Sequence, residues 1–231
     1  MGADPGRPAS VDHQPLAPVA DLASLERDTK KKTLVATEQQ RAAVQVEREQ
    51  FRAILATYRA QDLVFLDETG VTTTMTRRYG WAPRGQRVID YVPHGHWKVL
   101  TVLGALTSDG ILAAMTVDAA TDSDVFRAYV TEVLVPALRP GQIVILDNLS
   151  AHKAAGVGEA IEAASCHLLY LPPYSPDLNP IEPGWSKWKE YLRAEKVRQL
   201  EALTDTVGTG LRRITAQDAR GYWRDCGYPL Q

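Results

Sequence analysis

The chain has 231 residues, of which 45% are hydrophobic and 23% are charged, and its net charge is −2. These values are typical of a soluble globular protein with one domain of ordinary size and some additional segments. Apolar runs long enough to cross a bilayer and the apolar stretch of a signal peptide are both missing, so we expect no association with a membrane. The small net charge does not by itself indicate a nucleic-acid-binding protein. Cys166 and Cys226 lack the spacing of a metal site and suggest reduced thiols in a cytoplasm-like compartment.

The N-terminal part of the chain divides into an arm and a helix. Residues 1–33 are rich in Pro, Ala and Asp, which predicts a flexible arm or linker. Residues 34–60 form an N-terminal segment that we expect to pack on the core or lead into it. Thr37 and Gln40 match a capping box, and apolar side chains follow at helical spacing, which predicts a helix over 38–59. The apolar side chains of its predicted face are Val44, Phe51, Leu55 and Tyr58.

Residues 61–231 alternate between short apolar runs and helical patterns. "DLVFLDETG" (62–70) predicts a buried strand, and "TRRYGWAPRGQR" (76–87) predicts a basic loop. "WKVLTVLGALTSDGILAAMTV" (97–117) predicts two strands joined by a turn at Ser108–Gly110. "DSDVFRAYVTEVLVPAL" (122–138) has helical spacing, with Asp122 or Ser123 as its cap.

The remaining elements continue this alternation of strands and helices. Strands are predicted in 141–148 and 166–172, and helices in 153–164, in 185–195 and around 200–217. A hairpin followed by alternating units predicts an α/β fold with a mixed sheet flanked by helices.

Two predicted core strands end in acids. Asp67 closes "LVFLD" and Asp147 closes "IVILD". Ligands of open α/β sheets collect beyond the carboxyl ends of the strands, so these two side chains can converge despite their separation in sequence. The alternative is that each aspartate caps only the turn that follows it.

Glu182 also has two interpretations. In "NPIE" (179–182), Asn179 can be the N-cap, Pro180 the first helical residue and Glu182 the third position of a capping box. On that interpretation Glu182 stabilises a helix and nothing more. The functional interpretation is that the helix start aims this carboxylate at the two aspartates. Three carboxylates on rigid elements suit divalent-metal phosphoryl chemistry, because Mg²⁺ prefers oxygen ligands.

Five strings of the sequence carry a family resemblance: "FLDETG", "TRRYGWAPRGQR", "HWKVLTVLGAL", "ILDNLSAHK" and "LPPYSPDLNPIEPGWSKWKEYLR". Together they resemble the catalytic domain of DDE transposases, most closely the IS630 group related to Tc1/mariner elements. The resemblance covers about residues 30 to 195. It implies an RNase H-like mixed five-stranded sheet. It also implies a site in which Asp67, Asp147 and Glu182 are the catalytic residues and the ligands of two Mg²⁺ or Mn²⁺ ions. The 34 residues between Asp147 and Glu182 fit the mariner-like pattern.

The resemblance implies a transposase that cleaves phosphodiesters at transposon ends and transfers the 3′ end to target DNA at TA dinucleotides. It further implies a homodimer on DNA, in the cytoplasm and associated with the nucleoid. A helix-turn-helix region usually precedes this domain, and the arm takes its place here. We therefore expect a separate helix-turn-helix polypeptide as partner, or a truncated copy. A non-catalytic DNA-binding remnant and another RNase H-like nuclease remain alternatives.

Several further residues have less specific signals. Glu68 is expected on the face opposite Asp67, and Asp177 in a turn. Pro183 and Gly184 favour a helix that starts one turn later. Trp185, Trp188 and Leu192 are spaced for packing into the core. The candidate DNA-contacting residues, for which solvated surface positions are the alternative, are Arg77, Arg78, Arg84, Arg87, Asn148, His152 and Lys187; His152 is also a candidate for orienting Asp147.

Overall fold

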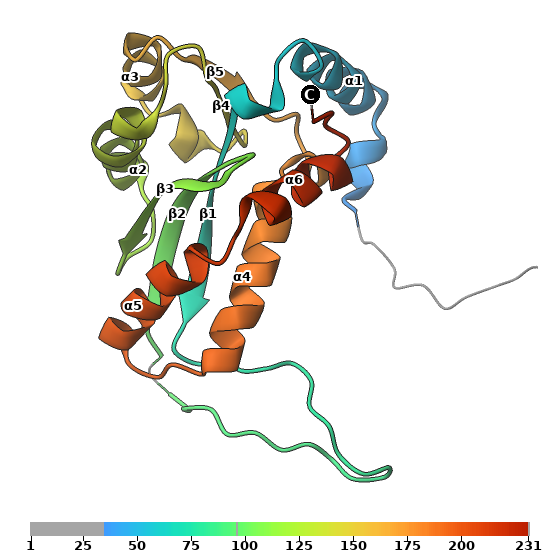
Figure 1. Cartoon of the computed structure of the whole chain (residues 1–231), viewed down its shortest axis with the longest axis vertical. Coiled ribbons are helices and arrows are strands. Elements are labelled where there is room, and N and C mark those ends of the chain that lie inside the picture. Colours follow the sequence, from blue (N-terminus) through green and yellow to red (C-terminus); the bar gives the residue numbers. More distant parts are fainter. Residues whose placement is uncertain (1–34, 96, 231) are drawn as a thin grey trace, which may run out of the picture. The chain divides into compact units, whose positions relative to one another are not determined.

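The computed structural model describes residues 35–95 and 97–230, and the arm predicted over 1–33 lies outside these residues. The described part contains a five-stranded sheet with the strand order β3-β2-β1-β4-β5 (Figure 1). β1 (Leu63–Thr72), β2 (Val99–Thr107) and β3 (Gly110–Val117) form an antiparallel meander. β4 (Ile143–Leu146) and β5 (His167–Tyr170) add to β1 as parallel strands. The predicted mixed five-stranded sheet is therefore confirmed.

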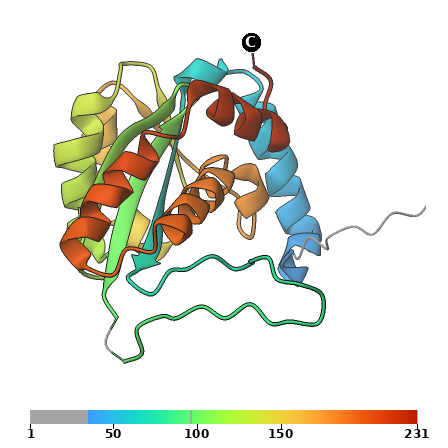
Figure 2. The same ribbon diagram turned by 60° about the horizontal axis from the view of Figure 1, so that its bottom comes forward.

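The two faces of the sheet bury two separate apolar clusters, because neighbouring side chains of a strand point to opposite faces. Phe65 of β1 belongs to the cluster that α4, α5 and α6 cover, whereas Val64 and Leu66 belong to the cluster under α2 and α3. Figures 1 and 2 show these two helical layers on either side of the sheet. The helices are α1 (Ala42–Leu55), α2 (Ser123–Tyr129), α3 (Val157–Ala163), α4 (Ile181–Glu195), α5 (Leu200–Leu211) and α6 (Ala216–Asp225).

The N-terminal helix is shorter than its sequence pattern suggests. A 3₁₀ turn, Thr37–Gln40, comes first, Arg41 is extended, and α1 then runs from Ala42 to Leu55. The predicted capping box is wrong, since neither the turn nor α1 has a side-chain cap. The apolar face is confirmed for Val44, Phe51 and Leu55, which are buried.

Other predictions hold in outline and change in detail. The β2–β3 turn at Ser108–Gly110 is confirmed, and Asp122 caps α2 by accepting hydrogen bonds from the amides of Asp124 and Val125. The helix predicted around 200–217 is two helices, because the chain turns between Leu211 and Ala216 and Thr215 caps α6.

A long segment, 73–98, connects β1 and β2 and extends away from the sheet (Figure 2). It carries exposed aromatic side chains, of which Trp81 is the most exposed. Among the described residues, no helix combines the length and the apolarity that crossing a membrane requires.

Candidate active site

Asp67 lies within β1, and Asp147 directly follows β4, the parallel strand next to β1. The β1–β4 ladder pairs Leu63 with Ile143 and Phe65 with Ile145. Asp67 lies two residues beyond Phe65, and Asp147 lies two residues beyond Ile145. Both acids therefore lie just beyond the paired part of the ladder, at the edge of the sheet formed by the carboxyl end of β4, and both line the same cavity. This is the edge at which α/β sheets collect ligands.

The sequence predicts that Asp67 ends its strand, and this prediction is wrong. β1 continues to Thr72, and Asp67 pairs with Gly104 of β2. On the other side β4 ends at Leu146, so β1 has no β4 partner at the level of Asp67. The early end of β4 opens the space beside Asp67.

Glu182 faces this edge from the first turn of α4. The helix begins at Ile181 with Pro180 before it, and no side chain caps it, so the predicted capping box with Asn179 as N-cap is wrong. The predicted one-turn delay is also wrong, because α4 includes both Pro183 and Gly184. Proline is tolerated there because the first amides of a helix have no partner within the helix.

The three carboxylates line one cavity of about 450 Å³. Asp67 and Asp147 form its floor at the edge of the sheet, and the proline-rich segment before α4 forms a wall. The described residues that line it are Asp67, Asp147, Asn148, Leu149, Leu171, Pro172, Pro173, Tyr174, Ser175, Pro176, Asn179 and Glu182.

Asp67 is fixed by two donors and is difficult to ionise. Its Oδ1 accepts from the amide of Glu68 at 2.8 Å, and its Oδ2 accepts from the indole Nε1 of Trp185 at 3.1 Å. Burial, followed by the nearby charge of Glu182, raises the pKa of Asp67 to about 7. Burial also raises the pKa of Glu182, to which the charge of Asp147 contributes. The cavity thus concentrates negative charge in a partly desolvated place.

His152 contacts Asp147. The ring is 1% exposed and stacks on Phe126, so the solvated alternative for His152 is wrong. Its Nδ1 is hydrogen-bonded to Oδ1 of Asp147, which also accepts from the amide of Leu149 at 3.2 Å. Although burial opposes the charged imidazole, the bond to Asp147 and its charge raise the pKa of His152. The contact holds the carboxylate of Asp147 in one orientation.

The donor chemistry of this cavity fits a divalent cation. Its three acids offer only oxygen ligands, and a cation would offset the burial and the repulsion that raise the pKa values of Asp67 and Glu182. Within residues 35–95 and 97–230, however, no group of three His, Cys, Asp or Glu side chains is arranged to hold a metal ion. The three acids thus share a cavity without forming a coordination shell within the described residues.

The candidate DNA-contacting residues do not all lie at this cavity. Asn148 lines it, and the four arginines lie exposed on the segment between β1 and β2. Lys187 points elsewhere: its Nζ pairs with Asp218 of α6 at 2.6 Å. The structure therefore does not bring Lys187 to the three acids.

Lys189 was missed in the sequence and lies closer to the acids than Lys187. It is half-buried, and the charges of Glu182 and Asp67 act on it. Burial, together with neighbouring Arg193, lowers the pKa of Lys189. The sequence offered one signal for this position. Lys189 follows Glu182 by seven residues, which is about two helical turns, so the two side chains lie on one face of α4.

Trp185 was expected in the core, and it is 3% exposed. What the sequence did not reveal is that its indole N–H reaches out of the core to Asp67. A buried tryptophan needs an acceptor for its indole N–H, and this requirement was the signal in the sequence for a polar contact of Trp185.

The fold and this acidic cavity define an RNase H-like domain with three carboxylates near the edge of its sheet. A family model described as "DDE superfamily endonuclease" matches residues 62–204. The chain belongs to this family. No curated protein sequence matches the chain.

Solved structures share the fold. A Mos1 transposase paired-end complex with left transposon end is 17% identical with a TM-score of 0.69, and the match covers 89% of this chain and 64% of that chain. A Mos1 mariner paired-end complex with Mn is 18% identical with a TM-score of 0.70 and covers the same shares. The catalytic domain of Mos1 mariner transposase is 16% identical with a TM-score of 0.58, with 85% of this chain and 91% of that chain covered. The chain thus spans about 64% of the transposase chains in the paired-end complexes. The family match confirms the predicted membership of the DDE enzymes, and the Mos1 structures confirm the predicted fold.

Proposed function

We propose that this chain is the catalytic subunit of an IS630-type DNA transposase, which cleaves phosphodiesters at transposon ends and transfers the 3′ end to target DNA at TA dinucleotides. One observation carries the proposal: Asp67 of β1, Asp147 directly after the neighbouring parallel strand β4, and Glu182 of α4 line one cavity. Membership of the DDE endonuclease family supports it.

Asp67, Asp147 and Glu182 are the proposed catalytic residues and the proposed ligands of two Mg²⁺ or Mn²⁺ ions. Such ions, when bound, would activate water and stabilise charge on the attacking and leaving oxygens. Solved Mos1 paired-end complexes with Mn and with Mg support this choice of cation. Trp185 and His152 keep Asp67 and Asp147 oriented, and the ionised form of Asp67 is the one that binds a cation.

We propose that DNA approaches along the basic residues near the cavity. Lys189 lies on the face of α4 that carries Glu182, and its ammonium suits a phosphate next to the scissile bond. Arg77, Arg78, Arg84 and Arg87 lie on an exposed segment whose aromatic side chains are also exposed, and such surfaces are typical of binding sites. Action as a homodimer on DNA, a separate helix-turn-helix partner and a location at the nucleoid remain parts of this proposal.

The test measures nicking of supercoiled plasmid by the purified chain in the presence of Mg²⁺ or Mn²⁺. Asp67→Asn, Asp147→Asn and Glu182→Gln should each abolish nicking and leave the far-ultraviolet circular dichroism unchanged. Asp205→Asn, a matched change of an exposed acid on α5, should nick as the wild type does. Full nicking by Asp67→Asn or Glu182→Gln would show that the assignment is wrong.

One observation favours a second candidate, the non-catalytic DNA-binding remnant: within the described residues the acids are not arranged to hold a metal ion. Wild-type chain that binds duplex DNA without nicking it in either cation would support that candidate. Preferential cutting of RNA/DNA hybrids would instead indicate another nuclease of the same fold.

A further inference from the structure

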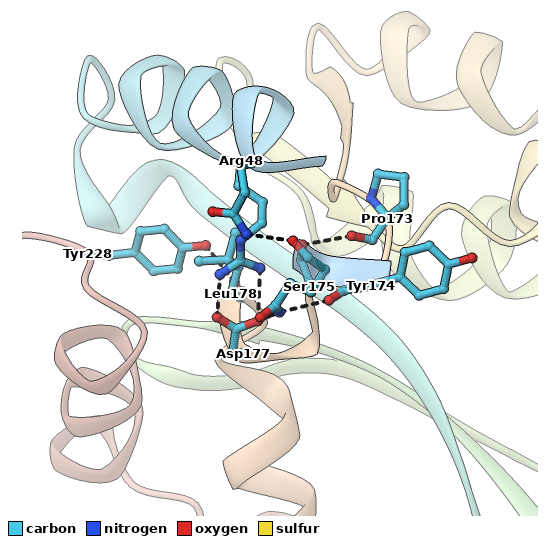
Figure 3. Close-up of polar contacts among 9 residues, drawn as sticks. Arg48, Pro173, Tyr174, Ser175, Asp177, Leu178 and Tyr228 are labelled. Atoms are coloured by element: carbon cyan, nitrogen blue, oxygen red, sulfur yellow. Dashed lines mark hydrogen bonds and ion pairs between the residues drawn. The ribbon is translucent and has the colours of Figure 1, made fainter. Parts of the chain in front are cut away.

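The N-terminal helix makes an ion pair with the segment that leads into α4. Arg48 of α1 donates from Nη1 to Oδ1 of Asp177 at 2.9 Å and from Nη2 to Oδ2 at 2.6 Å (Figure 3). The pair is bidentate, which fixes the relative orientation of the two groups as well as their distance. The Arg48 side chain is only 6% exposed. Two parts of the chain 129 residues apart are thereby joined.

Two further side chains hold the same segment. The side-chain amide of Gln39 donates to Oδ1 of Asp177 and to the carbonyl of Tyr174, both at 2.9 Å. From the C-terminal end of the chain, the hydroxyl of Tyr228 donates to the carbonyl of Leu178 (Figure 3). The segment 174–178 is therefore fixed by side chains from outside it.

This segment is also the wall of the acidic cavity. Tyr174, Ser175, Pro176 and Asn179 line the cavity, and the carbonyl of Asn179 accepts from the amide of Glu182 at 3.2 Å. Tyr174 has a φ of 55°, a left-handed conformation that non-glycine residues rarely adopt without support from their surroundings. The start of α4, and with it the carboxylate of Glu182, follows directly from how this segment is held.

We propose that Arg48 is a positioning residue for the active site: through Asp177 it fixes the proline-rich wall and the start of α4, and so places Glu182 opposite Asp67 and Asp147. The inference rests on the proposed function for its kinetic consequence. It makes α1 a part of the active site rather than a neighbouring support. Arg48 itself touches neither the three acids nor the cavity they line.

The placement of Arg48 supports a role in positioning. It lies among Val44, Phe51 and Leu55 on the buried face of α1, where an apolar residue would pack without a desolvation penalty. A buried ion pair is weak evidence for stability, because the cost of desolvation offsets much of the attraction. What the guanidinium supplies that an apolar side chain cannot is a fixed direction toward Asp177.

The test compares Arg48→Met and Arg48→Lys with a matched control, Ile161→Ala. Ile161 is fully buried on the other face of the sheet, so its truncation destabilises the chain without touching the segment 174–182. All variants are assayed at a temperature at which each is folded, by nicking of supercoiled plasmid in Mn²⁺ and by hydrogen exchange of the peptide covering 174–182.

Arg48→Met should lower the nicking rate at saturating DNA by about tenfold, because small displacements of a catalytic group are costly, and leave the KM for DNA within about twofold. Its exchange over 174–182 should become faster. Arg48→Lys should nick faster than Arg48→Met but more slowly than the wild type, since its ammonium keeps the charge but cannot make the bidentate contact of the guanidinium with Asp177. Ile161→Ala should keep both the wild-type rate and the wild-type exchange over 174–182.

A wild-type rate at saturating DNA for Arg48→Met overturns the inference, and so does an equal loss of rate in Ile161→Ala. If the wild-type chain itself does not nick, the proposed function fails, and hydrogen exchange alone decides: faster exchange in Arg48→Met supports the positioning contact, and unchanged exchange overturns it.

Discussion

The indole N–H of Trp185 donates to Oδ2 of Asp67 across 3.1 Å, from a side chain that is otherwise part of the core. Asp67 comes from β1 and Trp185 from α4, three residues after Glu182. One turn of α4 therefore presents a carboxylate to the cavity and a hydrogen-bond donor to the opposite carboxylate. The packing of α4 on the sheet and the geometry of the acids cannot change independently.

Trp185→Phe should impair the site more than the fold. Phenylalanine keeps an aromatic ring in the core but cannot donate to Asp67, and the lost bond favoured the ionised carboxylate. We expect the pKa of Asp67 to rise further, nicking at pH 7 to fall about fivefold, and the pH–rate profile to move to higher pH. Plasmid nicking from pH 6 to 9 measures this, and a profile that coincides with that of the wild type would contradict it.

Gly104→Ala should displace the same indole. A Cβ built at Gly104 would lie 2.5 Å from Cη2 of Trp185, closer than atoms of this kind approach one another. We expect a loss of about 1–3 kcal/mol in the free energy of unfolding, together with reduced nicking. Gly70→Ala is the matched control, since its Cβ would make an ordinary contact at 3.9 Å with Val99. Urea unfolding of both variants measures the difference, and equal stability of the two would refute the argument.

Lys189→Gln should weaken DNA binding where Lys187→Gln does not. Lys189 stands near Glu182 and Asp67, whereas Lys187 pairs with Asp218. If Lys189 contacts a phosphate, its loss should reduce the slope of log K against log salt concentration by about 1 and weaken binding of all sequences alike. Fluorescence anisotropy with a duplex over a range of salt concentrations measures the slope. A larger effect from Lys187→Gln would reverse the assignment.

Removal of Asp177 should cost more unfolding free energy than removal of Arg48, its partner in the ion pair. Asp177→Ala leaves a buried guanidinium without its carboxylate, which we expect to cost about 3 kcal/mol of unfolding free energy. Arg48→Met leaves a carboxylate that is 46% exposed and open to water, so the cost should be about 1 kcal/mol. Urea unfolding at pH 7 measures both values, and a larger loss in Arg48→Met would mean that the burial of the arginine does not set the cost.

The same pair should be sensitive to acid. The hydrogen bonds and charge of Arg48 hold the pKa of Asp177 below its usual value. A carboxyl whose pKa is lowered on folding contributes stability that is complete above its unfolded pKa of about 3.9 and disappears as the pH falls through the folded pKa. The difference in unfolding free energy between wild type and Asp177→Asn should thus be constant from pH 7 to about 5 and shrink below about 4. The difference in unfolding free energy between wild type and Asp205→Asn serves as the control. A difference for Asp177→Asn that grows as the pH falls would contradict the lowered pKa of Asp177.

Much of the fold followed from local patterns. The order of strands and helices, the turn at Ser108–Gly110 and the cap at Asp122 are set by residues close together in sequence, and they were predictable for that reason. The start of α4 was only partly predictable: the "NPIE" pattern placed it at Pro180, local preference at Pro183 and Gly184 argued for a later start, and buried Ile181 and Trp185 draw the first turn against the core. Tertiary packing overrides weak local preferences of this kind.

By itself, the sequence identified the candidate side chains for the proposed chemistry, which are two aspartates near the ends of apolar strand patterns and a glutamate at a helix start, and it carried the motifs of the family. Chemical identity and spacing along the chain are local properties, and a sequence displays them. Only the tertiary structure decided that Asp67, Asp147 and Glu182 line one cavity, that the charges of Glu182 and Asp67 act on Lys189, and that Arg48 holds Asp177. Some of these relationships join residues that are far apart along the chain, and others depend on how α4 is rotated against the sheet. Only the packing of the core fixes these distances and this rotation.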